Sequence, residues 1–186
     1  AGSGNAGMVN TLLELGANPN AADSMGYSAL MYAAQLGATE AVNVLLEAGA
    51  DIDAVSSEGW TALLLTALQG QAETASALLE HGADKDITFG GGFTPLMVAA
   101  ARGHAEVTEA LLEGGVDIGK ALSDGRTALM AAAEGGHIEV VKELLEHGAD
   151  PNRRSNGGAN AGVSALNNGH TEVALELASA GAEFNA

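Results

Sequence analysis

The sequence predicts an all-α repeat solenoid, and three observations lead to that prediction. The pair Gly-Ala, once Gly-Val, recurs every 33 residues without an insertion or deletion, at Gly16, Gly49, Gly82, Gly115, Gly148 and Gly181. Two further glycine series keep the same period. About a third of the 186 residues are alanine or glycine and only 3 % are aromatic. This composition favours short elements packed against copies of themselves over one large core.

Each repeat is expected to begin with a hairpin and a short helix. The second glycine series marks the hairpins at Gly26, Gly59, Gly92, Gly125 and Gly158. A hydroxyl residue then precedes an apolar run, at Ser28, Thr61, Thr94 and Thr127. Such a residue acts as an N-cap, and Pro95 directly after one of them fits the first helical turn. We therefore predict short alanine-rich helices, such as one over residues 96–101.

The third glycine series predicts where these short helices end. It comprises Gly37, Gly70, Gly103, Gly136 and Gly169. A glycine can take the left-handed conformation that a tight turn after a helix requires. A second helix follows, with apolar residues at helical spacing as in Val140, Val141, Leu144 and Leu145. It is expected to stop at the Gly-Ala pair, before an extended turn such as residues 83–92.

This unit of helix, turn, helix and hairpin resembles the ankyrin repeat over essentially the whole chain. The best-matched stretch runs from Gly125-Arg126-Thr127-Ala128-Leu129-Met130 through Gly148-Ala149-Asp150-Pro151-Asn152. The resemblance implies an ankyrin solenoid with four full repeats between two partial ones. The expected boundaries are 1–22 (partial N-terminal repeat), 23–55, 56–88, 89–121, 122–154 (full repeats) and 155–186 (degenerate C-terminal capping repeat).

The sequence departs from the family pattern at three places. The His of the family's Thr-Pro-Leu-His is replaced by Met31, Leu64, Met97, Met130 and Val163, so apolar packing is expected instead of its hydrogen bonds. Gly162 stands where a core leucine belongs, which predicts a weak C-terminal cap that frays first. At the other end we expect only a second helix, from Met8 to Leu15, in a half-repeat that is either a cap or the edge of a longer array.

Charge and composition argue against several functions. The formal charge is −17, and the first basic residue is Lys85, which disfavours binding to a nucleic acid backbone. The chain has no cysteine and no run of 18 apolar residues, so we expect no disulfide, no cysteine-ligated zinc and no membrane span. We found no phosphate loop or His-Glu-x-x-His motif and expect no catalytic residues, metal site or cofactor. His104, His137 and His170 share one register, about 10 Å apart per repeat, and are expected to be structural.

The family resemblance implies a concave groove lined by hairpin tips and first helices, where partners bind. The residue after each hairpin glycine is Tyr27, Trp60, Phe93, Arg126 or Ala159. Tyrosine, tryptophan and arginine are the residue types that dominate interface hot spots. The alternative is that these aromatic residues only pack against their own hairpins. The candidate partner-binding residues are Met25, Tyr27, Leu36, Glu58, Trp60, Leu68, Gln69, Phe93, Arg102, Arg126 and Glu134.

A second candidate patch is basic. Lys120, Arg126, Arg153 and Arg154 fall on the hairpins of the last repeats and could dock an acidic segment or a phosphate. Four bases in a chain of charge −17 could equally serve only to offset local repulsion.

We expect a non-enzymatic protein-interaction module that acts as a monomer and binds a protein or peptide with basic residues. The resemblance also favours an intracellular location. Two alternatives stay open: an engineered or computed ankyrin scaffold without a natural partner, and an ankyrin segment cut from a larger multidomain protein. The indel-free spacing and the Ala-Gly-Ser-Gly start, which looks like an expression scar, permit the first, whereas the irregular hairpins look natural.

Overall fold

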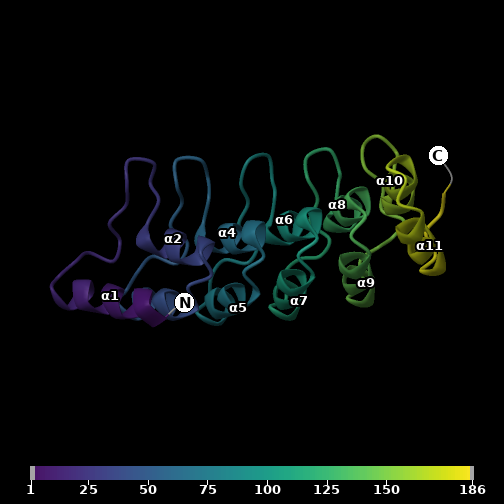
Figure 1. Cartoon of the computed structure of the whole chain (residues 1–186). Helices are drawn as coiled ribbons and strands as arrows, with labels where there is room; N and C mark the ends of the chain where they lie inside the picture. Colours follow the sequence, from purple (N-terminus) through teal and green to yellow (C-terminus); the bar gives the residue numbers. More distant parts are fainter. Residues whose placement is uncertain (1–2, 185–186) are drawn as a thin grey trace.

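The computed structural model describes residues 3–184 and shows an elongated stack of helix pairs (Figure 1). The sequence prediction of an all-α repeat architecture is confirmed. Helices are separated by turns and hairpins, and the only β-type pairs in the described residues are isolated bridges at the bases of hairpins. The helices are α1 (Ser3–Glu14), α2 (Ala29–Gln35), α3 (Thr39–Glu47), α4 (Ala62–Gln69), α5 (Ala72–Glu80), α6 (Pro95–Arg102), α7 (Ala105–Glu113), α8 (Ala128–Gly135), α9 (Ile138–Glu146), α10 (Ala161–Asn167) and α11 (Thr171–Ser179).

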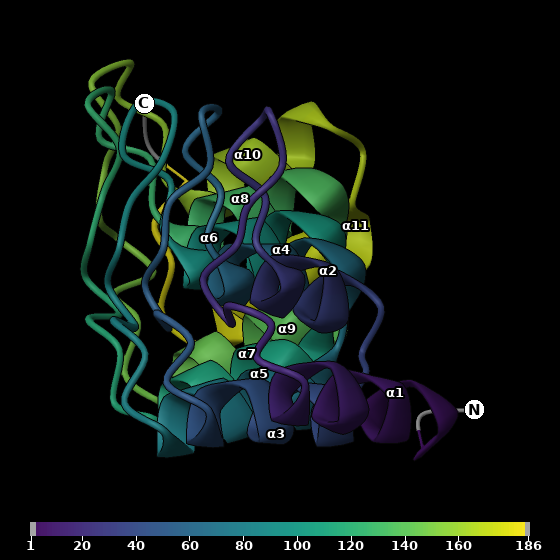
Figure 2. The ribbon, with the colours of Figure 1, turned by 90° about the vertical axis from the view of Figure 1, so that its left-hand side faces the viewer.

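The helices form two layers. The first helices of the repeats, α2, α4, α6, α8 and α10, lie side by side in one layer (Figure 1). The second helices form the other layer. The hairpins project beyond the first helices, on the side away from the second helices (Figures 1 and 2). This arrangement puts the hairpin bases and the first helices on one continuous surface.

The predicted N-caps are present at every first helix. The hydroxyl oxygen of Thr61 accepts a hydrogen bond from the amide of Leu64 at 3.3 Å, and Thr94 does the same for Met97 at 3.2 Å. In the last repeat the amide oxygen of Asn160 takes this role at 2.9 Å from the amide of Val163. These bonds satisfy amide groups that a helix leaves unpaired at its start.

The predicted C-terminal glycines adopt the left-handed conformation. Gly70, Gly103 and Gly136 end α4, α6 and α8 with φ angles of 75°, 73° and 73°. A side chain there would be strained, and at Gly103 it would also meet the ring of His137. The recurring glycines therefore allow the tight turn between the two helices of a repeat.

Small and aliphatic residues fill the core between the layers. Ala67, Ala99 and Ala133 on the first helices and Leu78 and Leu111 on the second helices are fully buried. Alanine lets neighbouring first helices approach closely, while large buried side chains on both layers, such as Leu63 and Leu78, supply buried apolar area. Four of the residues that replace the family histidine are buried as well: Met31, Leu64, Met97 and Met130. The fifth, Val163, is half-buried.

A ladder of side-chain hydrogen bonds joins the loops of successive repeats. Asn20 bonds to both the amide of Asp51 and the carbonyl of Gly49. Asp53 and Asp86, in the same register, accept only the amide of the next repeat, at 2.9 and 3.2 Å. Gly119 occupies the register in the third repeat and has no side chain to continue the ladder.

The histidine column also links repeats, which agrees with the structural role expected for it. The Nε2 atoms of His104, His137 and His170 lie 3.2, 3.2 and 3.0 Å from the carbonyl oxygens of Leu68, Ala101 and Glu134, one repeat earlier. Each contact satisfies a carbonyl near the C-terminus of a first helix.

The N-terminal helix is longer than the sequence predicted. It begins at Ser3 and not at Met8, and so includes Gly4, which stands at the register of the inter-helix turn glycines. On this helix Met8 and Leu12 are 68 % and 51 % exposed. In the next repeat the residues at the same register, Ala41 and Leu45, are buried.

The C-terminal repeat keeps its packing by an unexpected route. The space beside Gly162, where the other repeats have a core leucine, is occupied by the ring of Phe184. The main chain of Glu183 is held on both sides: its amide donates to Asn152 Oδ1 at 2.7 Å and its carbonyl accepts from Asn160 Nδ2 at 2.5 Å. The segment after α11 thus covers a gap that the sequence alone indicated as a defect.

Candidate binding surface

The residues predicted to face a partner are presented by a hydrogen bond that recurs in every hairpin. The amides of Asp23, Ser56, Phe89, Leu122 and Ser155 donate to the carbonyl oxygen four residues later, at distances of 2.8–3.0 Å. The accepting residues form a column, one per repeat: Tyr27, Trp60, Phe93, Arg126 and Ala159. Because the same bond closes each hairpin, successive column residues lie at equivalent places along the surface.

Aromatic side chains gather between the second and third repeats. The ring centroid of Phe89 lies 4.3 Å from that of Trp60 and 5.9 Å from that of Phe93. Phe89 is not among the residues that the sequence predicted for this surface. Its 33-residue spacing from Ser56, which closes the Trp60 hairpin, was the signal that could have placed it there.

These rings line a hollow of about 180 Å³, here called the Trp60 hollow. Its wall combines the hairpin bases with the first helices α4 and α6. The lining residues are Trp60, Leu68, Phe89, Phe93, Val98, Ala101 and Arg102. The hollow brings together four of the predicted residues, and apart from the guanidinium of Arg102 its lining side chains are hydrocarbon or aromatic.

A second hollow of about 260 Å³ lies one repeat further along the surface. It shares Phe93 and Ala101 with the Trp60 hollow, so the two are adjacent. Leu122 and Met97 contribute apolar surface, while Arg126 and Glu134 contribute charge. The predicted residues of the third and fourth repeats therefore meet here.

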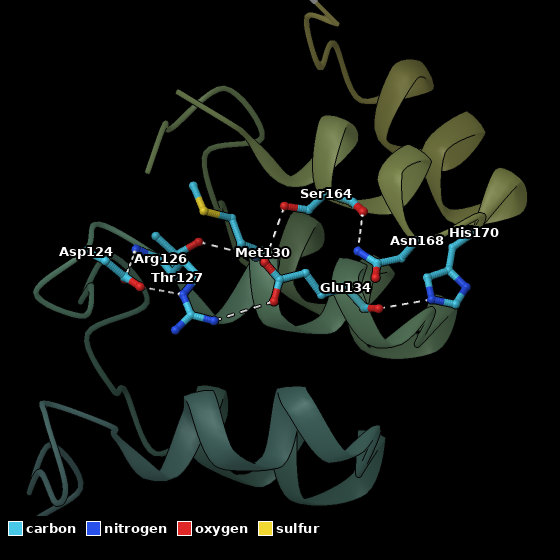
Figure 3. A network of polar contacts seen from close by, with 8 residues as sticks. All are labelled: Asp124, Arg126, Thr127, Met130, Glu134, Ser164, Asn168 and His170. Carbon is cyan, nitrogen blue, oxygen red and sulfur yellow. Dashed lines mark hydrogen bonds and ion pairs between the residues drawn. The ribbon is translucent and has the colours of Figure 1, made fainter. Parts of the chain in front are cut away.

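Arg126 is held between two carboxylates (Figure 3). Its Nε lies 2.7 Å from Asp124 Oδ2, and its Nη1 lies 3.7 Å from Glu134 Oε2. Glu134 also accepts a hydrogen bond from the hydroxyl of Ser164 at 3.5 Å, which ties the pair to α10. The guanidinium lowers the pKa of Asp124, as does the hydrogen bond that Asp124 accepts from the amide of Arg126, the largest cause. The arrangement carries a net charge of −1, with the arginine already neutralised.

In the first repeat an aspartate organises the surface. Asp23 Oδ1 accepts the amides of Met25 and Tyr27 at 2.8 and 2.9 Å, and Oδ2 accepts the hydroxyl of Tyr32 at 2.7 Å. The Tyr32 bond is the main cause that lowers the pKa of Asp23, and it raises the pKa of Tyr32. The ring of Tyr32 lies 5.6 Å from that of Tyr27. Tyr32 was also missed by sequence reasoning.

The remaining predicted residues lie outside the two hollows. Met25 and Leu36 are 47 % and 69 % exposed on the first repeat, and Glu58 and Gln69 are exposed on the second. Burial raises the pKa of Tyr27, and the negative charge of Glu58 adds to that rise, so Glu58 lies close to the first hairpin. This part of the surface therefore combines exposed apolar side chains with the acidic side chain of Glu58.

Three of the four basic residues of the second predicted patch have separate partners. Lys120 donates to the carbonyl of Asp86 at 2.8 Å and lies 3.9 Å from its carboxylate. Arg126 is bound by Asp124 and Glu134, and Arg154 donates to the carbonyl of Gly158 at 2.8 Å. Arg153 is exposed in the same hairpin. Two of the four charges are thus offset by carboxylates of this chain.

Two other features of the described chain bear on its chemistry. Within residues 3–184, no three His, Asp or Glu side chains come close enough together to hold a metal ion. None of the helices described combines the length and the apolarity needed to cross a membrane.

The fold defines an all-helical repeat protein, and comparison with known families places it further. The family model of ankyrin repeats (3 copies) matches residues 1–56, 48–122 and 96–186, and so spans the whole chain. The chain belongs to the ankyrin-repeat family. No curated protein matches it in sequence. Ankyrin repeats are generally protein–protein interaction modules and are typically non-enzymatic.

Proposed function

We propose that this chain is a non-enzymatic binding module that takes a protein or peptide partner on the surface formed by its hairpin bases and first helices. The observation that carries the proposal is the Trp60 hollow, where three aromatic rings and Leu68 line a depression at the surface. Concave apolar sites with a few polar groups at the edge are the usual places where ligands bind.

The support of this surface by the fold also favours binding. Two hydrogen bonds join Trp60 to Ser56: the amide of Trp60 donates to the hydroxyl oxygen of Ser56 at 3.1 Å, and the amide of Ser56 donates to the carbonyl oxygen of Trp60 at 2.9 Å. Neighbouring hairpins are tied together, as where both the amide and the hydroxyl of Ser57 donate to the carbonyl of Met25 at 2.9 Å. A surface ordered before binding loses little conformational entropy on association.

The alternative explanation is that the aromatic residues only stabilise the hairpins. The contact between Trp60 and Phe89, which joins two repeats, gives these rings a structural role in any case. Binding and packing are compatible, because both rings are only half-buried and keep part of their surface exposed to solvent. Variants must therefore be compared for folding as well as for binding.

The test uses a triple variant, Tyr27→Ala, Trp60→Ala and Phe93→Ala, beside the unchanged chain. Proteins captured from an extract by the unchanged chain and lost from the variant are purified, and their affinities are measured by calorimetry. We expect at least a tenfold loss for the true partner, as for hot-spot residues in other interfaces. The control variant, Leu15→Ala with Leu175→Ala, changes residues that are 81 % and 63 % exposed outside this surface.

Equal affinity of the folded triple variant and the unchanged chain would reject this surface as the binding site. Circular dichroism melting of each variant shows whether the fold is intact. The conservative change Trp60→Phe keeps an aromatic ring in the hollow and serves as a second readout if the triple variant unfolds.

A further inference from the structure

The geometry points to one kind of partner for this surface: an extended peptide segment with a bulky apolar side chain in the Trp60 hollow and a basic residue a few positions away, over Glu58 and Asp23. This inference rests on the proposed function and adds to it the chemistry and orientation of the segment. It depends on three features of the surface: the apolar hollow, the acidic side and the isolated arginine.

The hollow selects a bulky apolar side chain. Its volume of about 180 Å³ accommodates one leucine-sized or phenyl-sized group, and its lining presents the rings of Trp60, Phe89 and Phe93 together with Leu68. A polar group placed there would lose its hydration, and the lining offers only donors in return, the indole N–H of Trp60 and the guanidinium of Arg102. Burial of an apolar group removes its surface from water and stabilises the complex.

The side of the hollow toward the first repeat is acidic. Residues 1–84 contain ten acidic residues and no lysine or arginine. Asp23 accepts the amide of Tyr27, and Ser57, the neighbour of Glu58, donates to the carbonyl of Met25, so Asp23 and Glu58 lie on two hairpins that are hydrogen-bonded to each other. Burial raises the pKa of Tyr27, and the charges of Glu58 and Asp23 add to that rise. Glu58 is exposed, and Asp23 carries its negative charge beside the exposed Tyr32. Residues 1–84 contain no lysine or arginine that could neutralise these two carboxylates. They can therefore attract a basic residue of the partner.

The other side of the hollow is marked by Arg102. This residue is exposed at the end of α6 and lines the hollow. Within the described residues its guanidinium forms no ion pair, whereas Arg126 is paired with two carboxylates. Arg102 repels a basic side chain and Glu58 attracts one. The two charges together set the orientation of the peptide, with its basic residue toward the first repeat.

The spacing of repeats sets the distance between the two groups of the peptide. Neighbouring repeats lie about 10 Å apart, and an extended chain covers about 3.3 Å per residue. A basic residue within about three positions of the apolar anchor therefore reaches the acidic side. A peptide that binds this surface should show both groups at a constant spacing.

The experiment selects peptides from a randomised dodecapeptide library displayed on phage, using the unchanged full chain at low salt. We expect enriched sequences that combine a leucine-sized or aromatic residue with a lysine or arginine about three positions away. Trp60 is the only tryptophan of the chain, so its fluorescence reports directly whether a synthetic enriched peptide enters the hollow. We expect a change in intensity or emission maximum that saturates with peptide concentration.

Two charge variants give opposite expected changes. Glu58→Gln should weaken binding of the enriched peptide by about two- to fivefold, the range of single exposed ion pairs. Arg102→Gln should strengthen it by a similar factor, because a like charge is removed. Raising the salt concentration should reduce both effects. A matched peptide with serine in place of its basic residue should respond to neither variant.

The outcomes separate this inference from the proposed function. In one outcome the enriched peptides share the apolar residue and change the fluorescence of Trp60, but they show no preference for a basic residue. That result would overturn the inference and leave the binding surface in place. Peptides that bind the Phe93→Ala variant and the unchanged chain equally, without a Trp60 response, would reject the surface itself. A selection that yields no enriched sequence would overturn the idea that a short extended segment suffices.

Discussion

The ring of Phe184 lies where a side chain on Gly162 would project. A Cβ atom at position 162 would come within 2.8 Å of Phe184 Cε1 and 2.9 Å of Cζ. The two residues are thus complementary: the glycine leaves space in α10, and the aromatic ring from the segment after α11 fills it. The effect of a change at one position should depend on the residue at the other.

The first prediction is that the effect of Gly162→Ala on the free energy of unfolding depends on the residue at position 184. In a Phe184→Ala background the new methyl group has room, and alanine should stabilise the helix by about 0.5–1 kcal/mol. With Phe184 present the ring must shift, and we expect a neutral or destabilising effect. Urea unfolding of the four chains of this double-mutant cycle measures the difference. Equal effects in both backgrounds would show that the ring does not occupy the space.

The second prediction concerns the interruption of the loop ladder at Gly119. Residues at this register elsewhere bond to the next repeat, as Asn152 does with the amide of Glu183 and the carbonyl of Gly181. Gly119 has an ordinary negative φ, and its added Cβ would lie 3.4 Å from Asp117 Oδ1, which is tight but not a clash. Gly119→Asn should therefore raise the free energy of unfolding by about 1 kcal/mol or more.

The control for this change is Gly119→Ala. Replacing glycine by alanine also restricts the unfolded chain, which stabilises the protein by about 0.4–1 kcal/mol. The alanine variant therefore shows this backbone effect without the new hydrogen bonds. We expect asparagine to exceed alanine, as measured by chemical denaturation. An alanine variant as stable as the asparagine variant would mean that the ladder contributes nothing at this junction.

The third prediction concerns Asp23 and Tyr32. The hydrogen bond between them raises the pKa of Tyr32, so its phenol should ionise above the pH range of an ordinary tyrosine. Asp23→Asn removes the negative charge and should bring the pKa of Tyr32 down. The absorbance change at 295 nm measures this in a Tyr27→Phe background, which leaves one tyrosine of the chain's two. An unchanged titration would show that the bond does not form in solution.

The same pair predicts a pH dependence on the acid side. The pKa of Asp23 is lowered by folding, so its contribution to stability is present above the ordinary carboxyl pKa and is lost as the pH falls through the lowered value. The amides of Met25 and Tyr27, which donate to this carboxylate, should shift in NMR spectra over that range. In Asp23→Asn these shifts should disappear.

The fourth prediction is the order in which repeats open. Each repeat contacts only its neighbours, so the ends of the stack lose support first. Hydrogen exchange should be fastest in α1 and in residues 158–184, and slowest in α6 and α7 at the centre. If residues 158–184 were the best protected part, the clasp made by Asn152, Asn160 and Phe184 would be stronger than the central packing.

The repeat architecture was predictable because it depends on local rules that appear in the residue pattern. A left-handed turn requires a glycine such as Gly103, and a helix start favours a residue such as Thr94, so both recur at the repeat period. Tyr27, Trp60 and Phe93 could be placed in one column for the same reason. Phe89 and Tyr32 were not, because the register of Phe89 holds Asp23, Ser56 and Ser155 in three other repeats and Tyr32 lies on the helix.

The sequence by itself determined the period, the helix pairs, the caps and the acidic character of the chain, since each follows from neighbouring residues or from composition. Only the tertiary structure decided which side chains meet. It stacked Phe89 on Trp60 to form the hollow, neutralised Arg126 between Asp124 and Glu134, and brought Phe184 to Gly162. These contacts depend on how hairpins and helices of different repeats approach one another in space, which residue spacing along the chain does not specify.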